Sequence, residues 1–174
     1  MMFLTDIWEQ SRNFLETGGE ILTLIAFVTF LLWFLIFERF FFLKSEYPAI
    51  EKKIVDDWNE RKDRDSWEAL RVREQIISEA GVKLFKKVSF IKTLVAICPL
   101  LGLMGTVTGM INVFDVMGFV GNSNTRLMAS GISLATIPTM AGMVASLSGL
   151  YFENLLESKA RKAKHVLAEK LNHN

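Results

Sequence analysis

The chain has 174 residues, a formal net charge of +1 and 51% apolar residues. The apolar residues are concentrated in three long uncharged runs, which is typical of a polytopic membrane protein and argues against a soluble domain with a patterned core. The single cysteine, Cys98, excludes an intrachain disulfide, and we expect it to act as a small apolar residue within a membrane helix.

Residues 1–20 predict a short amphipathic helix that lies on the periplasmic surface of the membrane that the chain spans. Phe3 and Trp8 fall on one side of this helix and acids on the other. It either packs on its own bundle or binds a partner. A cleavable signal peptide is not expected, because acidic residues outnumber the single basic residue, Arg12. The first apolar run is therefore interpreted as a retained membrane helix.

The first predicted span covers residues 21–43. Its uncharged part ends at Phe37, and Glu38 and Arg39 follow before another apolar stretch. A long side chain such as that of Arg39 can snorkel to the headgroups. We favour an interface role for Glu38 and Arg39, including an ion pair between neighbouring subunits, over a role in conduction.

Residues 44–92 predict a cytoplasmic helical domain. Apolar residues recur at four-residue steps, and charges cluster around a turn between Asn59 and Ser66. Pro48 falls near the start of a helix, where proline is tolerated. The segment is too small for a large core of its own, so we expect it to extend the membrane helices and to pack against copies of itself.

The second and third spans are predicted at 93–115 and 127–152, joined by a turn at 116–126. A basic amphipathic helix follows at 153–174. Lys and Arg are concentrated between residues 38 and 92 and after residue 152, which places these segments in the cytoplasm and the N-terminus and the short turn outside. The predicted fold class is an all-α membrane protein with three spans.

Two glycines and two prolines mark the second and third spans. The Gly105-xxx-Gly109 spacing favours close helix contact, which we assign to a subunit or helix interface. Pro99 and Pro138 each remove a backbone amide inside a span and so predict helix kinks. In the third span, Pro138 frees the carbonyl of Leu134.

Hydroxyl residues accompany these prolines. The three- and four-residue spacing of Thr136, Thr139, Met143 and Ser146 predicts one shared face. Two interpretations carry equal weight: the hydroxyls satisfy carbonyls at a helix kink, or they line a polar pore. Thr106 in the second span belongs to the same candidate pore lining.

Ionisable residues are absent from the deep parts of spans two and three. Proton conduction normally needs such a group within the membrane, so a conducting chain would need a partner that supplies it. The sequence has no nucleotide loop, metal-ligand cluster or nucleophile with a base. We therefore expect no enzyme activity, no cofactor and no metal.

The motif Pro99-Leu-Leu-Gly-Leu-Met-Gly-Thr106-Val-Thr-Gly109 resembles the second-span signature of the ExbB, TolQ and MotA proton channel family. Gly131-Ile-Ser-Leu-Ala135 and Thr139-Met-Ala-Gly142 resemble its third-span motif, and the Glu38-Arg39 pair is also similar. The chain resembles the compact ExbB forms, and its departures from the family pattern indicate a subunit of an alternative TonB system. One departure is Leu134, where many relatives carry a glutamate.

The resemblance implies an inner-membrane motor subunit of a Gram-negative bacterium. Such subunits form a ring, expected to be a homopentamer, around an ExbD-like single-span partner that carries a membrane aspartate. The complex uses the proton motive force to energise a TonB-like protein for import of iron-siderophores or vitamin B12. The family's polar ring threonines correspond to Thr106 and Thr139. A nucleic-acid partner is not expected.

Two alternatives remain for the function. The first is a TolQ-like subunit of the Tol-Pal envelope-maintenance motor. The second is a non-conducting membrane scaffold that only assembles a partner.

Overall fold

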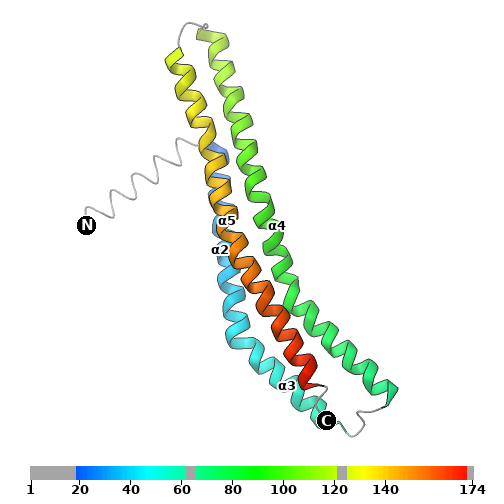
Figure 1. Cartoon of the computed structure of the whole chain (residues 1–174). Helices are drawn as coiled ribbons and strands as arrows, with labels where there is room; N and C mark the ends of the chain where they lie inside the picture. Colours follow the sequence, from blue (N-terminus) through cyan, green and yellow to red (C-terminus); the bar gives the residue numbers. More distant parts are fainter. Residues whose placement is uncertain (1–18, 62–65, 121–124, 172–174) are drawn as a thin grey trace, which may run out of the picture. The chain divides into compact units, whose positions relative to one another are not determined.

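The computed structural model of the chain describes residues 19–61, 66–120 and 125–171, and all regular structure within them is helical (Figure 1). The elements are α2 (Gly19–Phe41), the π-helix η1 (Phe42–Glu46), α3 (Tyr47–Asn59), α4 (Trp67–Val120) and α5 (Thr125–Lys170). The predicted all-α fold is confirmed. The helix predicted at residues 1–20 lies almost wholly outside the described residues.

Three helical stretches are long and apolar enough to cross a membrane. They are Gly19–Asn59, Trp67–Gly118 and Met128–Lys170. These stretches agree with the prediction of a polytopic membrane protein, since about 20 apolar residues span the hydrocarbon core. Large apolar side chains on their outer faces are exposed in the single chain, as on α2 at Phe27, Phe30 and Phe37. Such surfaces suit lipid or a protein partner.

The turn predicted at 116–126 is shorter in the structure. Helix α4 continues to Val120, and α5 begins at Thr125. The sequence interpretation gave too much weight to Gly118, whose cost of about 1 kcal/mol in a helix is small beside a run of helix-compatible apolar neighbours. Only residues 121–124 separate the two helices, and they lie outside the described part of the chain.

The π-helix η1 has a local cause in Pro48. Proline has no amide to bond the carbonyl of Lys44, four residues before it. The preceding amide, that of Tyr47, donates to the carbonyl of Phe42, five residues back. The π-type turn therefore connects α2 to α3, and Pro48 lies in the first turn of α3.

The described helices form two compact units. The first contains residues up to Leu32 together with Leu94–Gly149, and the second contains Trp33–Thr93 together with the residues from Leu150 onward. In the first unit, the buried side chains of α2 include Leu22, Ile25 and Leu32. Gly149 of α5 lies against Leu32 and Val95, which brings α2, α4 and α5 together there.

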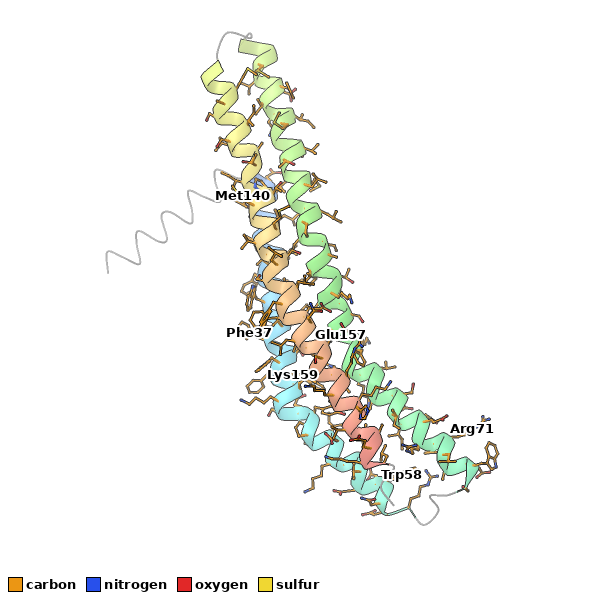
Figure 2. The ribbon with its side chains drawn as sticks, in the orientation of Figure 1. Phe37, Trp58, Arg71, Met140, Glu157 and Lys159 are labelled. Atoms are coloured by element: carbon orange, nitrogen blue, oxygen red, sulfur yellow. The ribbon has the colours of Figure 1, made fainter. Side chains whose placement is uncertain are left out.

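The second unit has a core of its own, shared between α3, α4 and α5. Trp58, labelled in Figure 2, lies in a buried cluster with Ala80 and Leu167. The Tyr47 hydroxyl donates to the carbonyl of Ala163, at 3.3 Å. The predicted cytoplasmic segment is therefore packed largely by the end of α5, which the sequence interpretation had treated as a separate tail.

Candidate functional site

The α4–α5 hairpin of the first unit is the candidate site, and glycines bring its two helices into close contact. A Cβ on Gly109 would lie 2.6 Å from Ala135 Cβ, and one on Gly142 would lie 2.6 Å from the carbonyl oxygen of Cys98. A Cβ on Gly105 would overlap Pro138. Backbone contact of this kind is typical of small residues in membrane helices.

The predicted packing role of Gly105 and Gly109 is thus realised inside one chain. Both glycines face α5, so they form an interface between the two helices of the hairpin. Sequence spacing indicates that a small-residue face needs a close neighbour, but it does not indicate which helix provides that neighbour. Pro138 forms part of the opposing surface.

Both prolines lie inside helices that continue through them, α4 through Pro99 and α5 through Pro138. Pro99 has no amide for the carbonyl of Val95, four residues earlier. The Ser146 hydroxyl donates to that carbonyl at 3.1 Å, across the hairpin. A freed carbonyl of α4 is therefore satisfied by a hydroxyl of α5, as backbone groups in a membrane require.

A second hydroxyl also joins the two helices. Thr139 donates to the carbonyl of Gly102 at 2.9 Å. Pro138 frees the carbonyl of Leu134 in the same helix, but the Thr139 proton is directed at α4 instead. Because each hydroxyl proton is directed at a carbonyl, its lone pairs remain available as acceptors. Thr139 and Ser146 are both half-buried.

The other two predicted pathway hydroxyls bond within their own helices. Thr106 donates to the carbonyl of Leu103, and Thr136 donates to that of Ser133. Thr106 lies one turn after Gly102, the acceptor of Thr139, and the described residues show no direct bond between Thr106 and Thr139.

Thr136, Thr139, Met143 and Ser146 lie within one arc of α5, as the spacing predicts, but they do not share one environment. Thr136 and Met143 are exposed, as is Met140 (Figure 2), whereas Thr139 and Ser146 face α4. An α-helix turns by about 100° per residue, so Thr136 and Ser146 are about 80° apart.

A cavity of about 630 Å³ opens beside these contacts in the first unit. Leu134 and Pro138 line it from α5, and Thr108 and Asn112 line it from α4. Leu134, at the position where the resemblance implies a glutamate, therefore presents an apolar side chain to this cavity.

Comparison with known proteins identifies the family. The model of the MotA/TolQ/ExbB proton channel family matches residues 43–169, which include the whole hairpin. The chain belongs to this family. Its relatives include biopolymer transport protein ExbB of Helicobacter pylori, 28% identical over 139 residues, which are 80% of this chain and 77% of that protein.

Two other relatives have higher sequence identity over shorter aligned segments. Biopolymer transport protein ExbB of Aquifex aeolicus is 31% identical over 46% of this chain and 54% of its own length. Putative biopolymer transport protein ExbB-like 1 of Synechocystis is 39% identical over 39% of this chain and 28% of its own length. The matches therefore span about half or less of these two relatives.

The charged pair at the end of the first predicted span packs inside the second unit of this MotA/TolQ/ExbB chain. Arg39 is 2% exposed, and its guanidinium donates to the carbonyls of Lys83 and Leu84 in α4. Its carbon Cζ lies 4.4 Å from the centroid of the Phe42 ring. Glu38 forms an ion pair with Lys87.

The described partners of Arg39 therefore lie in α4 and η1, and the described partner of Glu38 lies in α4. The sequence interpretation allowed Arg39 to snorkel to the headgroups. In the structure it points instead toward α4, which offers two carbonyl acceptors. This contact between α2 and α4 joins residues more than 40 positions apart, and residue spacing within one helix does not predict it.

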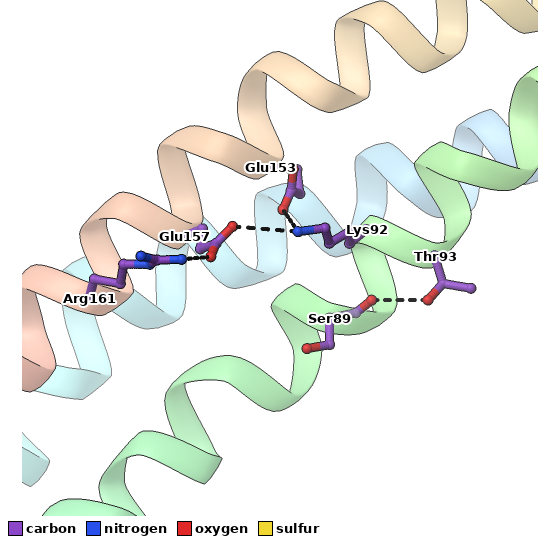
Figure 3. Close-up of polar contacts among 6 residues, drawn as sticks. All are labelled: Ser89, Lys92, Thr93, Glu153, Glu157 and Arg161. Atoms are coloured by element: carbon purple, nitrogen blue, oxygen red, sulfur yellow. Dashed lines mark hydrogen bonds and ion pairs between the residues drawn. The ribbon is translucent and has the colours of Figure 1, made fainter.

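Sequence reasoning missed one buried ionisable residue in this family member, Glu153 of α5. It is 1% exposed and lies near Lys92 of α4 (Figure 3). We had assigned residue 153 to the start of a solvated basic tail. Two features of the sequence could have indicated this burial. Glu153 directly follows an uncharged run, and it lies seven residues after Ser146.

Proposed function

We propose that this chain is the ring-forming subunit of an ExbB-type complex in the inner membrane of a Gram-negative bacterium. The ring, expected to be a pentamer, surrounds single-span helices of an ExbD-like partner. The complex uses the proton motive force to energise a TonB-like protein for import across the outer membrane. Membership of a proton channel family supports this proposal most directly.

The residues of this chain indicate which groups of the path it supplies and which groups its partner supplies. The residues from Leu94 to Phe114 and from Met128 to Phe152 include no Asp, Glu, His, Lys or Arg. A proton crossing these spans needs a titratable group, and we assign that group to the partner's acid. The chain supplies the housing, with spans proposed at 21–43, 93–115 and 127–152.

Thr139 and Thr106 are the pathway residues that we propose. The Thr139 hydroxyl is oriented by its bond to the Gly102 carbonyl, so its lone pairs can accept a hydrogen bond from a protonated carboxyl. Thr106 lies on the neighbouring turn of α4. Their role is to stabilise the protonated partner acid as it passes, because neither hydroxyl can hold an extra proton near neutral pH.

We expect Thr139→Val and Thr106→Val each to reduce energised outer-membrane uptake about 10- to 100-fold at normal protein levels. Without the hydroxyl, the proton of the buried partner carboxyl has no acceptor, which costs about 1–3 kcal/mol, and about 1.4 kcal/mol corresponds to a tenfold change in rate. Uptake of a siderophore in cells that express each variant is the measurement.

Thr139→Ser and Thr93→Val are the matched controls. The first keeps the hydroxyl, and the second removes a hydroxyl that bonds only the Ser89 carbonyl of its own helix. Both should take up the siderophore at rates near that of the unchanged protein. Undiminished uptake by Thr139→Val and Thr106→Val would instead indicate a scaffold that does not conduct.

A further inference from the structure

Glu153 is a buried carboxylate with an unsatisfied oxygen. Among the described residues, only Arg39 and Glu153 are buried residues with a charged side chain. The oxygen Oε1 of Glu153 has no hydrogen-bond partner. A carboxylate removed from water without hydrogen bonds costs several kcal/mol unless a partner compensates for the loss.

The compensation that Glu153 receives is weak and shared. Lys92 Nζ lies 4.0 Å from Glu153 Oε1 and 3.9 Å from Glu157 Oε2, so one ammonium faces two carboxylates (Figure 3). The Lys92 side chain is 68% exposed. Arg161 lies nearby but is paired with Glu157, at 2.5 Å.

The charged groups of α2 do not supply the missing partner. Glu38 is paired with Lys87, and Arg39 donates to the carbonyls of Lys83 and Leu84. A structural ion pair would need closer contact and satisfied oxygens. A bound cation is disfavoured because the ammonium of Lys92 already lies beside the free oxygen. The remaining property of this carboxyl is that it can change its protonation state.

Spacing along α5 gives a second, independent observation. Thr139, Ser146 and Glu153 follow one another at seven-residue steps, and such steps return to within about 20° on an α-helix. The first two donate their hydroxyl protons to α4 carbonyls. Glu153 is the titratable member of this series.

We propose that Glu153 is a proton-exchange residue of this chain, a role that rests on the proposed conduction function. Its carboxylate accepts a proton that has passed through the membrane part of the complex, forming the O–H bond with an oxygen lone pair. The neutral carboxyl then returns the proton to water next to the exposed Lys92, and the electron pair stays on the oxygen. Lys92 stabilises the carboxylate that remains.

The test uses the purified complex with its single-span partner, reconstituted in lipid vesicles. Proton flux under an imposed pH gradient should fall at least tenfold in Glu153→Gln and remain within twofold in Glu157→Gln. Glutamine keeps the size of Glu153 but cannot exchange a proton, and Glu157 belongs to the same network one turn away. Flux in Glu153→Gln equal to that of the unchanged complex would overturn the inference.

An infrared measurement tests Glu153 without relying on conduction. In the difference between spectra recorded at low and at high pH, the unchanged complex and Glu157→Gln should share a carboxyl C=O band that is missing from Glu153→Gln. In Lys92→Gln, which alters an exposed side chain, the midpoint of that band should rise by about one pH unit or more. If the unchanged complex does not conduct, the proposed function fails, and this band still decides the role of Glu153. A band that is unchanged in Glu153→Gln overturns it.

Discussion

Replacing Gly142 by Ala should destabilise the protein by about 2–3 kcal/mol, and replacing it by Leu should prevent accumulation of folded protein. A Cβ at this position would lie 2.6 Å from the carbonyl oxygen of Cys98 and 3.2 Å from the Cα of Gly102. Both neighbours are backbone atoms, so the helices must separate to admit it. Overpacking of this kind typically costs 1–3 kcal/mol and occasionally more.

Gly118→Ala is the matched control, since Gly118 also lies in a helix but has nothing within 4 Å of a Cβ. Alanine there should stabilise the helix by up to about 1 kcal/mol. The free energy of unfolding in detergent, measured by denaturant titration, should therefore change in opposite directions in the two alanine variants. Equal changes would mean that the close α4–α5 contact does not control stability.

Arg39→Ala should cost about 2–4 kcal/mol of stability. The change removes hydrogen bonds from a charged donor to the carbonyls of Lys83 and Leu84, and it leaves a cavity beside the Phe42 ring. The same denaturant titration measures the cost.

Two other substitutions separate the parts of this contact. Arg39→Met fills the space without a charge and should be much less harmful, because replacing a buried charge by an apolar group of similar volume is often tolerated. Lys87→Gln removes only the exposed partner of Glu38 and should cost about 1 kcal/mol or less. An Arg39→Ala protein as stable as Lys87→Gln would contradict the buried role of Arg39.

The sequence was sufficient to predict the membrane helices and to predict that Gly105 and Gly109 contact another helix closely. Uncharged runs of 17, 22 and 26 residues predict membrane helices by length and composition, and the Gly105-xxx-Gly109 spacing predicts a neighbour at short distance. Neither pattern shows that this neighbour is Pro138 and Ala135 of the same chain. That pairing depends on the register of the hairpin, which involves residues about 30 positions apart.

The hydroxyl contacts show the same limit. From the sequence, Pro99 frees the carbonyl of Val95 and Pro138 frees that of Leu134, but which hydroxyl reaches a freed carbonyl depends on the opposing helix. In the structure, Ser146 reaches Val95, and Thr139 instead bonds Gly102. The burial of Glu153 was missed for the same reason, because burial depends on tertiary packing and not on position along the chain.

Proton flux into lipid vesicles tests the central claim most directly. The claim is that this chain houses a proton path whose titratable membrane group belongs to a partner. We predict that vesicles containing the chain together with an ExbD-like single-span protein conduct protons down an imposed gradient. Vesicles with the chain alone, or with a partner whose membrane aspartate is replaced by asparagine, should remain closed to protons. Equal flux from the chain alone would contradict the account.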